Sequence, residues 1–174
     1  MKRIAIQGEV GSFHDITAHH YFPDDQLQII CCPTFEEVFK NMHEDPTVIG
    51  IVAIENTIAG SLLHNYALLR DSGFTIVGEH KTHISHCICA LPGQKKEELT
   101  EVHSHPVALA QCQQYLSKYP NMKMVETEDT AGSAKNIAAK NLMGVAALCH
   151  ADAARLYGLE VLEEICPLSA RMIV

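Results

Sequence analysis

The sequence has no long apolar run. Its longer apolar segments, such as residues 48–54, are far shorter than the roughly 20 residues that a membrane-spanning helix needs. The N-terminus also lacks the apolar core of a signal peptide. We therefore expect no membrane partner, and we expect the cytoplasm as the compartment.

Positive charge is scarce as well. The 174 residues include 13 Lys and Arg against 21 Asp and Glu, which gives a formal net charge of -8, and no cluster of basic side chains occurs. This balance argues against a nucleic-acid-binding surface, but it leaves room for a local pocket that binds a small anion. The hydrophobic content of 47% is ample for the core of one domain or of two small lobes.

No pair of cysteines has the spacing of a zinc knuckle. Histidine and cysteine are crowded in residues 83–89, and His103 lies close to His105. Cys87 and Cys89 belong to an alternating run and are more simply interpreted as small buried hydrophobes. We therefore expect no metal. The seven cysteines are expected to be reduced thiols, since an odd number cannot all pair within the chain.

A polar triplet, Glu55, Asn56 and Thr57, follows the apolar, β-branched residues 48–54. Such a run predicts a strand buried on both faces. After the triplet, apolar residues recur at helical spacing over residues 58–70. The triplet is therefore predicted where a strand ends and a helix begins, at the sheet edge where open α/β proteins bind small ligands.

A second junction of this kind is predicted near the N-terminus. Residues 3–7 read as a strand, and two glycines at 8 and 11 permit a tight turn. Ser12 is placed to cap the next helix, with Asp15 three residues further on as an acidic variant of the capping box. A helix N-terminus at a strand's carboxyl end favours anions, although the same pattern also fits a plain connecting turn.

The order of these patterns predicts an α/β fold. Strands at residues 27–31, 48–54 and 74–79 alternate with helices, and a β-α-β-α-β series requires a mainly parallel sheet. Residues 78–91 run on without a helix, which indicates a crossing into a second lobe. Residues 159–165 lead back, and residues 171–174 form a last short strand. The expected lobes are residues 1–78 with 167–174, and residues 79–166.

The second lobe contains two more polar junctions. Pro106 is suited to the first turn of a helix in which Leu109, Cys112 and Leu116 form the inner stripe. Gln111 lies off that stripe, which leaves its amide able to point into a cleft. Residues 129–132 open another helix after a predicted strand.

Five segments, in order along the chain, resemble the motifs of the prephenate dehydratase family. They are residues 8–13 (Gly-Glu-Val-Gly-Ser-Phe), 53–60 (Ala-Ile-Glu-Asn-Thr-Ile-Ala-Gly), 104–112 (Ser-His-Pro-Val-Ala-Leu-Ala-Gln-Cys), 129–131 (Asp-Thr-Ala) and 154–159 (Ala-Arg-Leu-Tyr-Gly-Leu). The resemblance implies a two-lobed fold like that of type II periplasmic-binding proteins, with the active site between the lobes. It also implies a hydro-lyase of phenylalanine biosynthesis that converts prephenate into phenylpyruvate, carbon dioxide and water.

The resemblance carries further expectations. It implies no metal and no organic cofactor, and a homodimer or tetramer. Prephenate is the expected substrate, although arogenate differs from it only by an amino group in place of a keto group. Members usually continue into an ACT regulatory domain that binds phenylalanine. Since this sequence ends at Val174, we expect no ACT domain in it, and phenylalanine inhibition would need another chain.

The resemblance also assigns roles to residues. Asn56, Gln111 and the hydroxyl groups can donate hydrogen bonds to an anion without adding charge, whereas a carboxylate is harder to place beside a dianion. His105 is better explained as a partner of the helix start, and Cys112 as core. The expected catalytic residues are Glu55, Asn56 and Gln111, and the expected substrate-binding residues are Gly11, Ser12, Phe13, Thr57, Thr130, Ala131 and Arg171.

The match breaks at the family's Thr-Arg-Phe motif, which carries its central catalytic residue. If Arg171 is the motif arginine, Ala170 replaces the threonine and Met172 the phenylalanine. Ser169 offers a hydroxyl one residue early, but neighbouring side chains in a strand face opposite ways. Ser169 is therefore a catalytic candidate only with a backbone shift.

Three explanations of this difference stay open: a true dehydratase whose sequence is incomplete or altered near this end, an active variant that uses Ser169, or a catalytically weakened relative that still binds prephenate or another small carboxylate. The alternative from another class is a two-lobed binding protein that closes on prephenate or another small carboxylate. A metalloprotein is a third and weaker alternative.

Overall fold

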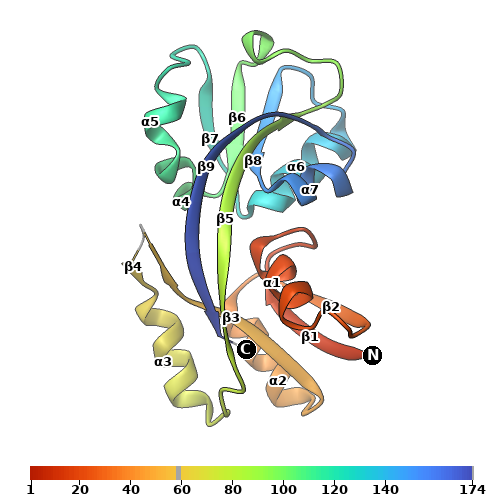
Figure 1. Cartoon of the computed structure of the whole chain (residues 1–174), viewed down its shortest axis with the longest axis vertical. Helices are drawn as coiled ribbons and strands as arrows, with labels where there is room; N and C mark the ends of the chain where they lie inside the picture. The colour runs from red at the N-terminus through yellow and green to blue at the C-terminus, as the bar shows by residue number, and fades with distance from the viewer. Residues whose placement is uncertain (58–59, 174) are drawn as a thin grey trace. The chain divides into compact units, whose positions relative to one another are not determined.

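The computed structural model describes residues 1–57 and 60–173, with the backbone alone for residues 166–173. The chain divides into two compact units, Met1–His83 with Ser169–Val174, and Ile84–Leu168. It passes from unit 1 into unit 2 within β5 (Glu79–Ala90) and returns within β9 (Glu160–Ile173), the two long strands in Figure 1.

Unit 1 is built on strands in the order β2-β1-β3-β9. Strand β1 pairs in parallel with β2 and β3, whereas β9 is antiparallel to β3. One face of the sheet packs against α2 and α3, with Val38, Phe39, Leu68 and Leu69 among the contacts. The elements before β5 are β1 (Lys2–Gln7), α1 (Phe13–Tyr21), β2 (Leu27–Cys32), α2 (Phe35–Glu44), β3 (Val48–Asn56), β4 (Gly60–Ser61) and α3 (Leu63–Ser72).

Unit 2 has the strand order β5-β8-β6-β7. Strand β6 is parallel to β7 and β8, and β5 is antiparallel to β8. The elements after β5 are the 3-10 turn η1 (Lys96–Glu98), β6 (Glu101–Ser104), α4 (Pro106–Gln111), α5 (Gln113–Leu116), β7 (Lys123–Glu126), α6 (Thr130–Lys140), β8 (Val145–Cys149), α7 (Ala151–Leu156) and β9.

Both faces of the unit 2 sheet are covered, as the alternation in β5 predicts. Cys87 and Cys89 pack into one core with α6 and α7, while Ile88 and Ala90 pack into another with α4 and α5. The interpretation of the two cysteines as buried hydrophobes is therefore confirmed. A hydrogen bond with Cys89, together with burial, raises the pKa of the Cys87 thiol, and a hydrogen bond with Cys149 raises that of Cys89.

Three predicted elements are wrong. Residues 74–78 form no strand: Gly73, with φ of 73°, ends α3, and Ile76 and Val77 are exposed. The helix predicted over residues 58–70 does not include residues 60–62. Gly60, with φ of 78°, instead lets the chain turn back as β4, antiparallel to β3, and the helix starts at Leu63; Ile58 lies outside the described residues. Finally, β9 is one continuous strand, rather than a returning segment and a separate last strand.

A partly buried histidine in α1 predicts how the stability of the fold depends on pH. Burial lowers the pKa of His14 from 6.5 to about 4, although a hydrogen bond to the backbone of Gln7 raises it. Below pH 6.5 the unfolded chain binds a proton at this position that the folded chain does not, so the stability falls as the pH drops from 6.5 to 4. We expect a loss of about 2 kcal/mol in the free energy of unfolding between pH 7 and pH 5.

Urea unfolding of the unmodified chain, of His14→Gln and of His83→Gln at both pH values measures this loss. His83→Gln is the matched control because it removes an exposed histidine of the same unit. A smaller pH-dependent loss in His14→Gln alone is the expected result. An equal loss in all three proteins would contradict the assignment to His14.

Candidate functional site

The end of β3 holds the first predicted site residues. Glu55 and Asn56 are its last two residues, and both are partly buried, while Thr57 is exposed. Strands flank this end on both sides. On one side Glu55 pairs with Ser61 and Asn56 with Gly60 of β4; on the other, Glu55 pairs with Arg171 and Asn56 with Ala170 of β9. The backbone of the altered motif thus lies beside the Glu-Asn pair.

A bulge at Ile54 sets this register. Ala53 pairs with Met172 and Glu55 with Arg171, so two steps along β3 match one step along β9. A regular ladder would instead place Ser169 opposite Asn56. Bulges of this kind re-aim side chains next to active sites. The described backbone therefore brings position 170, rather than 169, opposite Asn56; the side chains of Ser169, Ala170 and Arg171 lie outside the described part of the chain.

The bulge is braced by the helix that follows. The amide of Asn65 is 2% exposed and donates a hydrogen bond of 2.7 Å to the carbonyl oxygen of Ala53. The backbone N–H of Leu62 donates to the carbonyl of Ile54 over 2.9 Å. These two bonds satisfy the backbone carbonyls of Ala53 and Ile54 at the bulge, where the pairing of β3 with β9 is irregular. The sequence predicted no role for Asn65; its polar side chain within an otherwise apolar helical pattern was the available signal.

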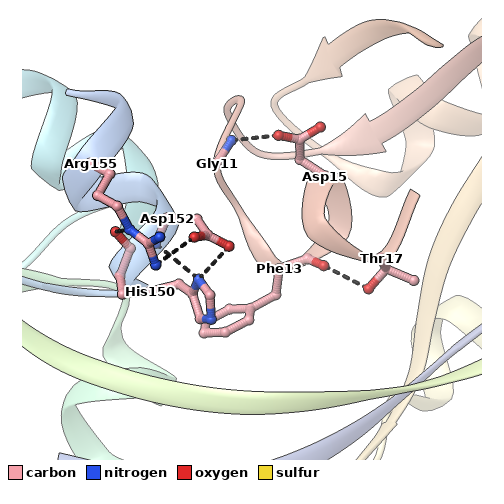
Figure 2. A network of polar contacts seen from close by, with 8 residues as sticks. Gly11, Phe13, Asp15, Thr17, His150, Asp152 and Arg155 are labelled. Carbon is pink, nitrogen blue, oxygen red and sulfur yellow. Dashed lines mark hydrogen bonds and ion pairs between the residues drawn. The ribbon is translucent and has the colours of Figure 1, made fainter. Parts of the chain in front are cut away.

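The glycine turn after β1 has the predicted geometry. Gly8 and Gly11 have φ of 98° and 88°, and the Ser12 hydroxyl accepts the backbone N–H of Asp15, which confirms Ser12 as the helix cap. The carboxylate of Asp15 accepts the N–H of Gly11 over 2.7 Å (Figure 2). Two reciprocal hydrogen bonds therefore stabilise the turn, one accepted by Ser12 and one accepted by Asp15. Since β1 and β3 are parallel neighbours, the turn follows the carboxyl end of β1, and the Glu-Asn pair forms the carboxyl end of the adjacent strand.

A buried hydroxyl pair supports the same turn. Thr17 donates a hydrogen bond of 2.6 Å to the carbonyl oxygen of Phe13, as Figure 2 shows, and lies 2.5 Å from the hydroxyl of Thr82 on β5. Because the single hydroxyl proton of Thr17 goes to Phe13, Thr82 is the donor to Thr17. This pairing links α1 to β5 within unit 1, and sequence periodicity gave no sign of it.

In unit 2, three parallel strands each end at a helix N-terminus. His105 follows β6, Asp129 follows β7, and His150 follows β8, and each side chain accepts a backbone N–H as the helix cap. The prediction that His105 serves the helix start is confirmed. Burial lowers the pKa of His105, with Asp129 and Glu126 acting in the opposite direction. The predicted residues Thr130 and Ala131 form the first turn of α6.

Gln111 is the last residue of α4 and is partly buried, while Leu109, Cys112 and Leu116 are buried as predicted. Its side-chain oxygen Oε1 lies 3.0 Å from Nε2 of His86 on β5. Burial lowers the pKa of His86, a hydrogen bond with Gln111 raises it, and the nearby His150 lowers it. The sequence placed His86 on one face of a strand but predicted no contact with Gln111.

A surface network at α7 was not predicted. The imidazole Nδ1 of His150 accepts the backbone N–H of Asp152 over 3.1 Å, and the Asp152 carboxylate lies 2.9 Å from the guanidinium of Arg155 (Figure 2). The spacing of Asp152 and Arg155, three residues apart on a helix, was the signal that could have found this pair. Arg155 is exposed.

The described residues contain no group of three or more His, Cys, Asp and Glu side chains that could hold a metal ion. Of the helices in this part of the chain, none is long and apolar enough to cross a membrane.

The comparisons with known proteins agree on one family. A family model described as prephenate dehydratase matches residues 4–167. The chain is 40% identical over 163 residues to arogenate dehydratase 3, chloroplastic, from Arabidopsis thaliana, with 93% of this chain and 38% of that protein covered. It is 33% identical over 165 residues to the bifunctional chorismate mutase/prephenate dehydratase of Escherichia coli, with 94% and 43% covered. The chain thus spans about two fifths of the length of these curated relatives.

Solved structures share the fold. A protein titled as GqqA, a novel type of quorum quenching acylase, shares 30% identity with a TM-score of 0.85, covering 99% of this chain and 63% of that one. The prephenate dehydratase of Arthrobacter aurescens in complex with L-Phe has a TM-score of 0.85 at 20% identity, with 98% and 59% covered, and so shows the fold alone. The predicted two-lobed α/β fold is confirmed, and the chain belongs to the prephenate dehydratase family.

Proposed function

We propose that the chain catalyses the decarboxylating dehydration of prephenate to phenylpyruvate, a hydro-lyase step of phenylalanine biosynthesis. The observation that carries the proposal is the family match over residues 4–167, with Glu55 and Asn56 at the carboxyl end of a central strand. In this reaction the ring carboxylate leaves as carbon dioxide, and its bonding electrons enter the ring. The ring hydroxyl takes up a proton and leaves as water.

The proposed roles follow from the charge of the substrate. Prephenate carries two carboxylates, and this chain carries a net charge of -8, so uncharged donors suit the substrate better than further anions. Asn56, Gln111, Thr57 and Thr130 are proposed as hydrogen-bond donors to it. Backbone N–H groups of Ser12 and Phe13 in the glycine turn, and of Ala131 in α6, are proposed as further contacts.

Glu55 and the end of β9 are proposed to act together. Glu55 has Arg171 as its backbone partner, and a carboxylate beside a dianion is tolerated best where a cation accompanies it. Departure of the ring hydroxyl requires a proton donor, which the family carries at the threonine that Ala170 replaces. Ser169 stays the proposed substitute, but the bulge at Ile54 places it one position beyond the partner of Asn56.

A comparison of turnover with prephenate and with arogenate tests the proposed substrate, because relatives of this chain are named as dehydratases of one or of both compounds. The purified protein would receive each compound separately, with phenylpyruvate and phenylalanine measured as the products. We expect a higher kcat/KM for prephenate. A higher value for arogenate would overturn the substrate while preserving the reaction. Turnover of neither compound above the spontaneous rate would contradict the proposed activity.

The compartment and the assembly are part of the proposal. We propose the cytoplasm, in line with the reduced thiols of the described cysteines, which are Cys31, Cys32, Cys87, Cys89, Cys112 and Cys149. We propose a homo-oligomer, a dimer or a tetramer, and size-exclusion chromatography with light scattering measures its mass. A monomer at micromolar concentration would contradict this part.

A further inference from the structure

Two residues of unit 2, 25 positions apart in the sequence, meet through their side chains. His86 is 2% exposed and is enclosed on β5, and Gln111 ends α4. Nε2 of His86 and Oε1 of Gln111 are 3.0 Å apart, a normal hydrogen-bond length. Both residues belong to the same compact unit, so this contact is internal to unit 2.

In this arrangement the amide oxygen of Gln111 faces the ring, and this sets the direction of the bond. An amide oxygen can only accept, so Nε2 of His86 must carry the proton. Burial lowers the pKa of His86 below its ordinary value of 6.5, although the hydrogen bond with Gln111 acts in the opposite direction, and this favours the neutral imidazole near pH 7. A neutral imidazole holds one N–H, and here that N–H is at Nε2. The arrangement therefore selects one of the two tautomers of His86.

The same bond selects one of the two orientations of the Gln111 amide. Rotation of the amide by 180° would exchange Oε1 and Nε2 and set an NH₂ donor against an N–H donor. With Oε1 held by His86, Gln111 presents its NH₂ group in the other direction. An NH₂ group attracts a carboxylate or a hydroxyl oxygen, whereas an amide oxygen repels a carboxylate.

We propose that His86 is a positioning residue for Gln111: its Nε2–H holds the amide oxygen, so that the amide nitrogen is the group offered to an anionic substrate. The identity of that substrate rests on the proposed dehydratase function, but the pairing of His86 with Gln111 does not. Positioning through a buried supporting residue of this kind is a general requirement for a precise site.

A set of substitutions at position 86 separates positioning from packing. Glutamine carries its NH₂ near the place of imidazole Nε2, asparagine carries it near Nδ1, and leucine carries no donor. We expect His86→Leu and His86→Asn to lower kcat/KM for prephenate by about 10- to 100-fold, and His86→Gln to retain most of it. His103→Leu, which removes a histidine paired with Glu101 on β6, is the matched control and should change little.

A double-mutant cycle provides the decisive readout. In a Gln111→Ala background, His86→Leu should cause no further loss in kcat/KM, since the group that it positions is gone. Additive losses would overturn the proposal, and so would equal losses in His86→Gln and His86→Asn. Melting temperatures of all variants identify any that fail to fold, and the cycle is read on the folded ones.

One measurement is independent of turnover. Nitrogen-15 NMR of the histidine rings in the ligand-free protein reports the tautomer of His86, assigned by comparison with His86→Gln. We expect the Nε2–H tautomer of His86 at pH 7 in the unmodified chain. In Gln111→Ala we expect the ring to exchange between the two tautomers or to adopt the other one. An Nδ1–H tautomer or a charged ring would overturn the proposal even if the chain turns over prephenate. If the chain turns over neither substrate, the proposed activity fails while this measurement still decides the pairing.

Discussion

Replacing Ala170 with threonine is expected to raise the rate of phenylpyruvate formation from prephenate by about 100-fold, the usual contribution of a positioned proton donor. Alanine can neither donate nor relay a proton. Position 170 is the backbone partner of Asn56 in the β3–β9 ladder, so the substitution adds a hydroxyl to the strand residue paired with the predicted site. Threonine also suits a strand, so little stability should be lost.

Ala170→Val is the matched control for this prediction. Valine has the branching and nearly the shape of threonine but lacks the hydroxyl, so it should leave the rate unchanged. The steady-state rate of phenylpyruvate formation would be measured for the unmodified chain, for Ala170→Thr and for Ala170→Val. An equal gain with valine would show that packing limits the rate, and no gain with threonine would show that position 170 is not where the proton donor is missing.

Ser169→Ala in the unmodified chain completes the comparison. If the chain uses the Ser169 hydroxyl, this substitution abolishes the remaining turnover, and the bulge at Ile54 must shift by one residue to let it act. If the remaining rate is unchanged, Ser169 has no part in the reaction.

Replacing Asn56 with aspartate is expected to lower kcat/KM for prephenate by about 1,000-fold. The change keeps the shape of the side chain but replaces an NH₂ donor with a negative charge. Two like charges about 4 Å apart near a protein surface repel by about 4 kcal/mol. Asn56→Ala removes the donor without adding charge, so its loss should be smaller, about 10- to 100-fold.

The order of these two losses tests the proposed role. A greater loss for Asn56→Asp than for Asn56→Ala indicates that the side chain faces an anion. Asn121→Asp, at an exposed position of unit 2, adds the same charge elsewhere and should change kcat/KM little. Comparable losses of kcat/KM in Asn56→Asp and Asn121→Asp would indicate that the effect comes from net charge. Full activity of Asn56→Asp would exclude Asn56 as a hydrogen-bond donor to the substrate.

Local rules predicted much of the fold. The cap at Ser12 depends on residues within three positions of one another, and its hydroxyl accepts the backbone N–H of Asp15, as the spacing predicts. The alternation in β5 predicted which residues enter which core, because the side-chain period of a strand is fixed at two. Such features can be read from a single sequence since they need no knowledge of distant partners.

Long-range pairing accounts for what the sequence did not predict. The apolar residues at 76 and 77 resemble a strand, but they belong to none of the strands in the described part of the chain and are exposed. The bulge at Ile54 exists only in relation to β9, more than 100 residues away. The contact between His86 and Gln111 and that between Asn65 and Ala53 likewise join segments that no periodicity connects. Predicted site residues were found by motif, whereas the residues that position them were not.

The measurement that tests the central claim most directly is steady-state phenylpyruvate formation by the unmodified chain over a range of prephenate concentrations, with the spontaneous reaction subtracted and Asn56→Asp measured alongside. A rate that saturates with prephenate and falls in Asn56→Asp is the predicted result. The absence of saturable phenylpyruvate formation by the unmodified chain would contradict the proposal that this member of the family is a prephenate dehydratase.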